Sequence, residues 1–274
     1  MTRNDSSGFD GRIKYYFTSD LDASLAEMSR MFLARPVADL QQFNIVRRKP
    51  DRIVFKEEAH GKIYYIKLFL PGNRKKICIN YFYGSPGLRN YKTLVLLNDC
   101  GVHTVKPVLA AVKAAPFWAP RSLCITEDFR GIPLAQFLCT VDSEADRRNV
   151  LDEFIQLYSI MLNNNFYQKD PALTNFLVRN NTVAMMDVDL VPRLPFRIWP
   201  VYFNNLIHLN KFLILGAMHN STLRLDDSDR RDILYRILKN VRKDIRDLSL
   251  LLERLEQATE MRMAKEGWTG GQKR

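Results

Sequence analysis

The apolar residues of this chain change their spacing near residue 130, and this change limits the folds that the chain can adopt. Before that point, β-branched and aromatic residues gather in short runs such as Arg52 to Lys56 and Lys62 to Leu70, which is typical of strands. After it, the apolar positions from Val150 to Leu162 recur with a period near 3.6, which indicates a buried helix. A β-rich part followed by a helical part predicts an α+β fold with two lobes, residues 1–128 and 129–274.

The first lobe is expected to hold a small antiparallel sheet and one helix. Ala59-His-Gly61 is a turn candidate between two strand-like runs, and it predicts a hairpin with Lys67 in the second strand. A leader helix is expected before the hairpin, and a second helix ends before Gly101, a natural helix stop. The remaining predicted segments are the cap Ser19-Asp-Leu-Asp22, the helix Leu88 to Asn98, and the strands Pro107 to Ala111 and Leu123 to Phe129.

The second lobe is expected to be mainly helical, with one hairpin that follows its first helix. The two extreme ends of the chain, Met1 to Gly11 and Gly267 to Arg274, have the composition of tails. The last helical pattern has apolar residues in alternating steps of four and three, and a helix packed on its own lobe is favoured over an intermolecular coiled coil. The predicted segments are the hairpin strands Phe176 to Val178 and Val183 to Met186, and the helices Trp199 to Met218 and Ser228 to Glu266.

Charge and composition exclude several classes of protein. The 41 Lys and Arg residues against 30 Asp and Glu give a net charge of +11, which favours an anionic partner such as a nucleotide or a phospholipid surface. Nucleic acid is disfavoured, because no array of stacking aromatic residues or helix-turn-helix pattern accompanies the charge. No run approaches the roughly 18–20 apolar residues of a membrane-spanning helix. The polar start lacks a secretory signal, and four scattered cysteines support neither a disulfide framework nor a zinc site. We therefore expect a cytoplasmic protein.

One string of polar residues carries most of the information about chemistry. Gln168-Lys-Asp-Pro-Ala-Leu-Thr-Asn175 follows the buried helix, and Asp187-Val-Asp189 follows the predicted hairpin. An acid in the first loop can orient a hydroxyl group, while an amide and a second acid can share the metal ions that neutralise a triphosphate. This arrangement predicts phosphoryl transfer. Asp189 is a secondary candidate ligand, because a turn acid is an equally good interpretation.

With a strand lysine, a helix and a further strand upstream, the chain resembles the protein-kinase-like superfamily, and within it the bacterial lipopolysaccharide kinases that act on Kdo or heptose. The resemblance covers about residues 64–213, somewhat over half of the chain. It implies that the chain uses ATP and Mg²⁺ to phosphorylate a sugar or lipid-linked sugar. The matching strings are Tyr65-Ile-Lys67, Gly101 to Pro107, Ser122 to Glu127, Phe166 to Asn175, Met186-Asp-Val-Asp189 and the stretch from Asn205.

The resemblance also implies roles for individual residues. Lys67 would hold the α- and β-phosphates of ATP, and Asp170 would act as the catalytic base or orient the hydroxyl group. Asn175 and Asp187 would hold magnesium beside the nucleotide. Glu127 and Phe129 would lie at the hinge segment that faces the adenine. The catalytic residues are thus expected to be Lys67 and Asp170, and the nucleotide and metal residues Lys67, Glu127, Phe129, Asn175 and Asp187.

The chain departs from the kinase pattern at three places, which keeps other functions open. Asn90 stands where a helix glutamate would pair with Lys67, Gln168-Lys169 replaces His-Arg, and no glycine-rich loop precedes the strand lysine. One alternative is a pseudokinase that acts as a binding or scaffold module. Another is a kinase for a small-molecule or protein hydroxyl group. Basic clusters such as Arg47-Arg-Lys49 also allow peripheral docking on the anionic inner membrane surface.

Overall fold

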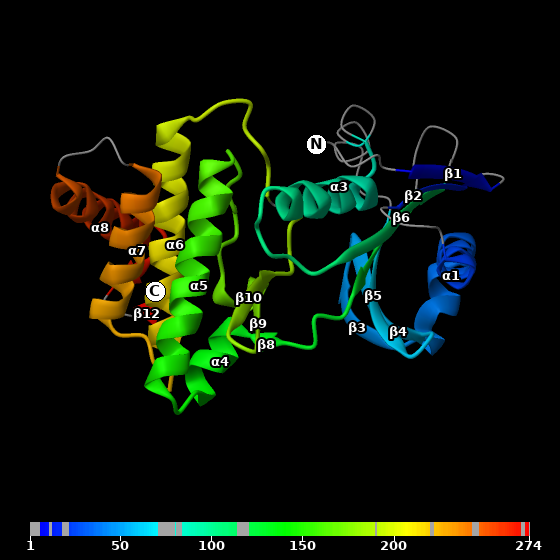
Figure 1. Cartoon of the computed structure of the whole chain (residues 1–274), viewed down its shortest axis with the longest axis horizontal. Helices are drawn as coiled ribbons and strands as arrows, with labels where there is room; N and C mark the ends of the chain where they lie inside the picture. Colours follow the sequence, from blue (N-terminus) through cyan, green and yellow to red (C-terminus); the bar gives the residue numbers. More distant parts are fainter. Residues whose placement is uncertain are drawn as a thin grey trace. The chain divides into compact units, whose positions relative to one another are not determined.

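The computed structural model describes residues 6–10, 13–17, 22–70, 80, 84–113, 121–189, 191–219, 222–242, 247–269 and 272–273. The chain forms two compact units. Unit 1 consists of residues 1–96 and 105–129, and unit 2 consists of residues 97–104 and 130–274. The first unit is built around a sheet and the second around helices (Figure 1), so the α+β, two-lobed fold that the sequence predicts is confirmed.

The centre of unit 1 is an antiparallel seven-stranded sheet with the order β1-β2-β6-β7-β5-β4-β3. The predicted hairpin is present, and its two-residue turn places both His60 (φ 52°) and Gly61 (φ 68°) in the left-handed region. Such turns match the right-handed twist of the strands that they join. The strands are β1 (Ser6–Asp10), β2 (Ile13–Phe17), β3 (Ile45–Lys49), β4 (Arg52–Ala59), β5 (Lys62–Phe69), β6 (Pro107–Lys113) and β7 (Ser122–Glu127).

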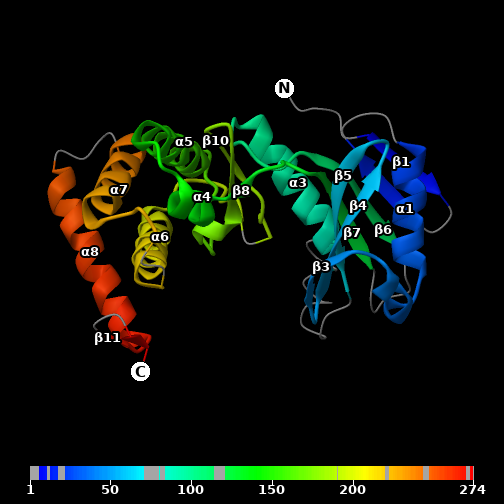
Figure 2. The same cartoon turned by 90° about the horizontal axis from the view of Figure 1, so that it is seen from below.

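Helix α1 (Ala23–Ala34) covers one face of this sheet, and α3 (Pro86–Asp99) lies against the other (Figure 2). Asp22 caps α1 by accepting hydrogen bonds from the backbone N–H groups of Ser24 and Leu25. The buried side chains of α1 join those of β2, β4, β5, β6 and β7 in one apolar core. A short 3₁₀ helix, η1 (Val37–Gln42), links α1 to β3 and adds the buried Leu40 to the same core.

Gly87 allows α3 to begin directly on the sheet. A Cβ atom at this position would lie only 2.6 Å from the backbone oxygen of Leu123 in β7, so any other residue would push the helix away. The N–H of Gly87 donates to the hydroxyl oxygen of Ser122 at 3.0 Å, which fixes the start of the helix. The end of α3 is set by Gly101, whose φ of +83° favours glycine.

Unit 2 is a group of helices joined to a small three-stranded sheet with the order β10-β9-β8. Helix α5 packs on α7, α6 packs on α8, and the hairpin of β9 and β10 lies beside α5 (Figure 1). The hairpin turns at Asn180 (φ 48°) and Asn181 (φ 59°), again with two left-handed residues. The elements are β8 (Ile132–Pro133), α4 (Leu134–Thr140), α5 (Glu144–Asn163), η2 (Leu173–Asn175), β9 (Phe176–Arg179), β10 (Thr182–Met185), α6 (Trp199–His219), α7 (Asp227–Val241), α8 (Leu248–Lys265), β11 (Trp268–Thr269) and β12 (Gln272–Lys273).

The long terminal helix expected over Ser228 to Glu266 is wrong, because two helices occupy this range. Helix α7 ends at Val241, and α8 begins at Leu248, where the Asp247 side chain accepts a hydrogen bond from the N–H of Leu250. The apolar residues of α7 and α8 keep one spacing in the sequence because the two helices pack against each other. A continuous apolar pattern therefore concealed two shorter elements.

The expectation of tails at both ends is also wrong for the parts that the structure describes. Strand β1 pairs with β2 from Ser6↔Phe17 to Asp10↔Ile13, and β11 pairs with β12 near the C-terminus. The sequence of β1, Ser-Ser-Gly-Phe-Asp, contains few residues that favour strands. Main-chain hydrogen bonds between strands can form with any side chains, so the composition did not reveal this strand.

The predicted boundary between residues 128 and 129 stays a prediction, and the observed units differ from it in one respect. Residues 97–104, which end and follow α3, belong to unit 2. The N–H of Met185 donates to the carbonyl of His103 at 2.9 Å, and Thr104 bridges to Met185 in parallel. This pairing with β10 attaches the segment to the helical unit.

Candidate active site

The loop that carries Asp170 begins where α5 ends. Asn165 has a φ of 65°, and the N–H of Phe166 donates to the carbonyl of Met161 at 3.0 Å, which closes the helix. From there the chain runs through residues 167–172 into η2, which ends at Asn175. The Nδ2 of Asn175 donates to the carbonyl of Asp170 at 2.8 Å. The two predicted residues of this loop are thus brought together.

Gln168 connects this loop to the one that carries Asp187. Its side chain is buried, and its Nε2 donates to the carbonyl of Asp187 at 2.9 Å. Its Oε1 accepts a hydrogen bond from the N–H of Asp170 at 3.2 Å. One neutral amide therefore sets the spacing of the two acids that the sequence assigns to catalysis and to metal binding.

Asn205 of α6 also holds the Asp170 loop, through hydrogen bonds of its side chain. Its Nδ2 donates to the carbonyl of Gln168, and its Oδ1 accepts a hydrogen bond from the Tyr158 hydroxyl at 2.7 Å. Burial raises the pKa of Tyr158, so this hydroxyl remains protonated and remains a donor. Both polar ends of the buried Asn205 side chain are thereby used.

Asp187 follows β10 and is half-buried. The N–H of Met186 donates to the carbonyl of Asn175 at 3.0 Å, which holds the residue before Asp187 beside η2. The N–H of Asp189 lies 3.4 Å from Oδ1 of Asp187, an arrangement that suits a turn acid. Within unit 2, the structure therefore brings Asp170, Asn175 and Asp187 together on two connected loops.

The donor set on these loops fits magnesium. Asn175 uses its Nδ2 on Asp170, which leaves its amide oxygen as the end that can bind a cation. Mg²⁺ prefers oxygen ligands and is commonly held by one or two protein oxygens together with substrate phosphates. Among the described residues, no three His, Cys, Asp or Glu side chains gather as they would around a metal ion held by protein alone.

Lys67 lies in unit 1, at the middle of β5, and is half-buried. In the sheet it is opposite Val54 on one side and Cys124 on the other. Burial raises the pKa of the Cys124 thiol to about 12, although the positive charge of Lys67 acts in the opposite direction. The thiol is therefore protonated at neutral pH.

The position at which the kinase pattern has a helix glutamate is occupied by Asn90 on α3. Asn90 is buried on α3, and the one acidic residue of α3 is Asp99 at its end. No carboxylate of α3 is thus available within unit 1 to pair with Lys67, because Asp99 belongs to unit 2.

Glu127 ends β7, on the strand next to that of Lys67, and Phe129 follows as the last residue of unit 1. The Glu127 carboxylate forms ion pairs with Lys106 at 3.1 Å and Lys62 at 3.4 Å. Burial alone would raise the pKa of Glu127, but the hydrogen bonds and charges of these two lysines lower it. The side chain therefore ties the end of β7 to its neighbours, and its predicted role in nucleotide binding stays a prediction.

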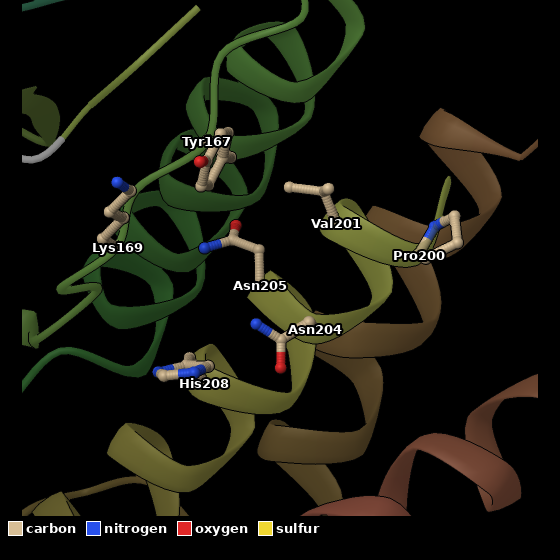
Figure 3. Close-up of a pocket in the computed structure, with 7 residues that line it drawn as sticks. All are labelled: Tyr167, Lys169, Pro200, Val201, Asn204, Asn205 and His208. Carbon is tan, nitrogen blue, oxygen red and sulfur yellow. The ribbon is translucent and has the colours of Figure 1, made fainter. Parts of the chain in front are cut away.

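A pocket of about 460 Å³ lies beside the Asp170 loop, within unit 2. Sequence patterns did not indicate this pocket, because its walls come from two segments about 30 residues apart. Figure 3 shows Tyr167 and Lys169 on the loop, with the side chain of Asn205 directed toward them from α6. The pocket is lined by Tyr167, Lys169, Pro200, Val201, Asn204, Asn205 and His208.

Comparisons with known proteins place the fold. No protein-family model matches the chain, and no curated protein matches it. A solved structure of WaaP in complex with acyl carrier protein matches with a TM-score of 0.58 at 16% identity, covering 87% of this chain and 95% of that one. The chain therefore shares the fold of this WaaP structure.

Two solved structures of WbdD, one of them described as a bifunctional kinase-methyltransferase, also match. Their TM-scores are 0.45 and 0.42 at 16% and 15% identity, and they cover 80% and 77% of this chain. The matches span 51% and 47% of those chains. At such TM-scores they carry no weight for the fold.

Proposed function

We propose that this protein is an ATP-dependent kinase that transfers the γ-phosphoryl group to a hydroxyl group of a sugar, most specifically a sugar of a lipopolysaccharide core precursor. The observation that carries the proposal is the pair of loops joined by Gln168, which holds Asp170, Asn175 and Asp187 in one hydrogen-bonded group. The WaaP-like fold supports it, because the order of these elements along the chain is the one that a kinase requires.

Each residue has one part in the proposed reaction. The acceptor oxygen bonds to the γ-phosphorus, the bond from that phosphorus to the oxygen bridging the β- and γ-phosphates breaks, and ADP leaves. Asp170 orients the acceptor hydroxyl group and takes its proton, while Lys67 neutralises charge on the α- and β-phosphates. Asn175 and Asp187 would hold Mg²⁺, which when bound neutralises the charge of the triphosphate.

Asp170→Asn and Asp187→Asn separate these roles. Asp170→Asn is expected to keep the affinity for ATP and Mg²⁺ within a few-fold while transfer falls by about 10²-fold or more, the scale of a positioned acid or base. Asp187→Asn is expected to lose the metal-dependent part of ATP affinity as well as transfer. The measurements are ATP titrations with and without Mg²⁺, beside single-turnover transfer to core oligosaccharide.

Asp142→Asn is the matched control, because the Asp142 side chain is 96% exposed and forms a surface ion pair with Arg224 at 3.2 Å. It should leave both measurements unchanged. Full activity in both site variants would remove the kinase assignment. Transfer to a small-molecule alcohol or a protein hydroxyl, but not to core sugar, would keep the kinase and change its acceptor.

Asn90 favours a second candidate, a pseudokinase that binds partners without catalysis. Its buried amide replaces the carboxylate that would orient Lys67. Wild-type protein that binds ATP and transfers phosphate to none of the lipopolysaccharide, sugar or protein acceptors would establish this alternative.

Because the WaaP structure is of a complex with acyl carrier protein, we also propose a protein partner of this kind, which co-elution of the two purified proteins tests.

We also propose that the protein docks peripherally on anionic membranes. No helix in the part of the chain that the structure describes has the length and apolar character to cross a bilayer. Arg47 and Arg48 are exposed on β3, the edge strand of the sheet, although charged residues there also protect the edge from pairing with other chains. Arg47→Ala with Arg48→Ala should reduce sedimentation with anionic vesicles at 0.1 M salt, and 1 M salt should abolish it, since the Debye length falls from about 10 Å to about 3 Å. Equal sedimentation of wild type and variant would contradict docking through this strand.

A further inference from the structure

The segment that leads into α6 pairs with the start of the Asp170 loop. Residues 192–197 form this linking segment. The N–H of Leu194 donates to the carbonyl of Asn165 at 2.8 Å, and the N–H of Tyr167 donates to the carbonyl of Pro192 at 3.3 Å. An antiparallel bridge lies between these two hydrogen bonds. The linking segment is thereby attached to the main chain that reaches Asp170 three residues after Tyr167.

Arg197 fastens the end of the linking segment to two helices. Its Nη1 donates to the carbonyl of Val241, the last residue of α7, at 3.1 Å. Its Nη2 donates to the Oδ1 of Asn163, the last residue of α5, at 2.9 Å. The last carbonyls of a helix have no partner within the helix and carry a partial negative charge, so a guanidinium group suits this position. One side chain therefore joins the C-terminal ends of α5 and α7 to the linking segment.

Asn165 is the residue at which these contacts meet. It lies two residues after Asn163, and its φ of 65° turns the chain from α5 into the Asp170 loop. Its carbonyl is bound by the linking segment, and its Oδ1 accepts a hydrogen bond from the hydroxyl group of Tyr202 in α6 at 3.0 Å. Burial raises the pKa of Tyr202, although the positive charge of Arg197 acts in the opposite direction, so this hydroxyl group stays protonated at neutral pH. The turn at Asn165 is thus held from α5, from α6 and from the linking segment.

The linking segment has no side chain through which phosphorylation could move it. In protein kinases, the loop before the acceptor region can be ordered by a phosphate group that pairs with arginine. From Val188 to Val201 the chain contains no Ser, Thr or Tyr, and it contains the three prolines Pro192, Pro195 and Pro200. Proline lowers the conformational freedom that a segment has when it is released. Arg197 therefore supplies an attachment that needs no modification, where a phosphate group would supply a reversible one.

We infer that Arg197 is a positioning residue, which holds the turn at Asn165, and with it the main chain that carries Asp170, in the arrangement that phosphoryl transfer requires. The inference rests on the proposed kinase function, because that function gives Asp170 its role. It goes further in naming the side chain that keeps the loop in place. Arg197 acts through Asn163 and Val241, its hydrogen-bond partners.

The experiment compares Arg197→Ala with wild type in single-turnover transfer to core oligosaccharide, with enzyme in excess over ATP. The rate constant should fall by about tenfold or more, because a small displacement of a reacting group is costly. ATP affinity should stay within about twofold. A variant that is merely less folded would keep the rate constant and show a lower stoichiometry in the ATP titration. Arg197 is exposed, so we expect the variant to fold.

Hydrogen exchange gives a second readout, which needs no catalysis. The N–H groups of Tyr167 and Leu194 join the two paired segments, so peptides that contain them should exchange about fivefold or more faster in Arg197→Ala than in wild type. Arg148→Ala is the matched control, because the Arg148 side chain is 73% exposed near the start of α5 and pairs with Glu144. It should change neither the rate constant nor the exchange.

Two further variants test the route. Asn163→Ala removes one acceptor of Arg197 and should slow transfer by about threefold. The double variant should be within about twofold of Arg197→Ala alone, because both changes break one connection. Arg197→Lys keeps the charge but loses the fork of two N–H donors, so its rate constant should lie between those of wild type and Arg197→Ala.

The outcomes separate this inference from the kinase function. Transfer by wild type, with a rate constant for Arg197→Ala within about twofold of it, would overturn the inference and keep the kinase. Independent, additive effects of Arg197→Ala and Asn163→Ala would also overturn it. Faster exchange in Arg197→Ala, in a protein whose wild type transfers phosphate to no acceptor, would remove the kinase function and keep Arg197 as the residue that holds the loop.

Discussion

Two segments that carry predicted site residues are held in place by different forces. In unit 2, the Asp170 loop is fixed by the neutral amides of Gln168 and Asn205, both buried. In unit 1, the end of β7 is fixed by ion pairs of Glu127 with two exposed lysines. Hydrogen bonds of buried side-chain amides are costly to break and insensitive to salt. Exposed ion pairs contribute little to the free energy of unfolding, and salt screens them. The main chain of the Asp170 loop is therefore held more firmly than the carboxylate of Glu127.

The largest expected effect comes from Gln168→Leu, which removes both ends of the amide. The carbonyl of Asp187 and the N–H of Asp170 then lose their partner, at a cost of about 1–3 kcal/mol each in the free energy of unfolding. Transfer should fall by about 10²-fold, since the two acids lose their spacing. Chemical denaturation and single-turnover transfer measure the two effects.

Two companions sharpen this prediction. Gln136→Leu makes the same change at an exposed position of α4 and should alter neither quantity. Gln168→His restores a side chain that can donate one hydrogen bond and accept another, and it should recover most of the transfer. A fully active and stable Gln168→Leu would mean that the loop is held by other contacts.

A smaller effect is expected from Lys67→Ala in unit 1. The proposed role of Lys67 is to neutralise the α- and β-phosphates of ATP, and a lysine does this as a flexible point charge with modest preorganisation. ATP affinity or turnover should fall by about tenfold or more. Lys56→Ala on β4 is the control, and an unchanged ATP titration for Lys67→Ala would remove this lysine from the site.

The smallest effect is expected from Glu127→Gln. The carboxylate is 27% exposed and its lysine partners are more exposed still, so the free energy of unfolding should fall by less than about 1 kcal/mol. The loss should shrink further at 1 M salt. A cost above about 2 kcal/mol would show that the lysines hold Glu127 as firmly as the amides hold the loop.

The same ion pairs predict a pH dependence with a definite sign. The folded protein lowers the pKa of Glu127 from 4.5, so the unfolded chain takes up a proton first as the solution is acidified. The contribution of Glu127 to stability is thus complete well above pH 4.5 and is lost as the pH falls through the lowered pKa. The neutral amides of the loop add no such dependence. Comparing the pH profiles of unfolding for wild type and Glu127→Gln isolates this contribution.

The sequence predicted the elements whose signal is local. The period of the apolar residues revealed α5, and the turn residues between β4 and β5 revealed their hairpin, because both signals lie within short stretches of chain. The break between α7 and α8 was missed since one apolar seam serves both helices. Strand β1 was missed because main-chain pairing holds it, and this needs no special side chains.

The prediction of the site shows the same division between local and long-range signals. Asp170, Asn175 and Asp187 could be predicted as site residues because the order of residue types along the chain is informative, and their roles stay predictions. The substitution at Gln168 was visible, but its role was not, since the bond to Asp187 spans 19 residues and the support from Asn205 comes from a helix 37 residues away. Pairings of that kind follow from packing, which a single sequence does not display.

The order of strands in unit 1 has a consequence during synthesis on the ribosome. Strands β2 and β5 are made early, yet each pairs with a strand of the later β6–β7 hairpin, about a hundred residues after β2 and some 60 after β5. At about 5–20 residues per second, β2 waits roughly 5–20 seconds for its partner. Both strands meanwhile expose main-chain edges on which another nascent chain can pair. The sheet is therefore most open to wrong pairing while it is being synthesised. The long separation of its paired strands along the chain prolongs that period.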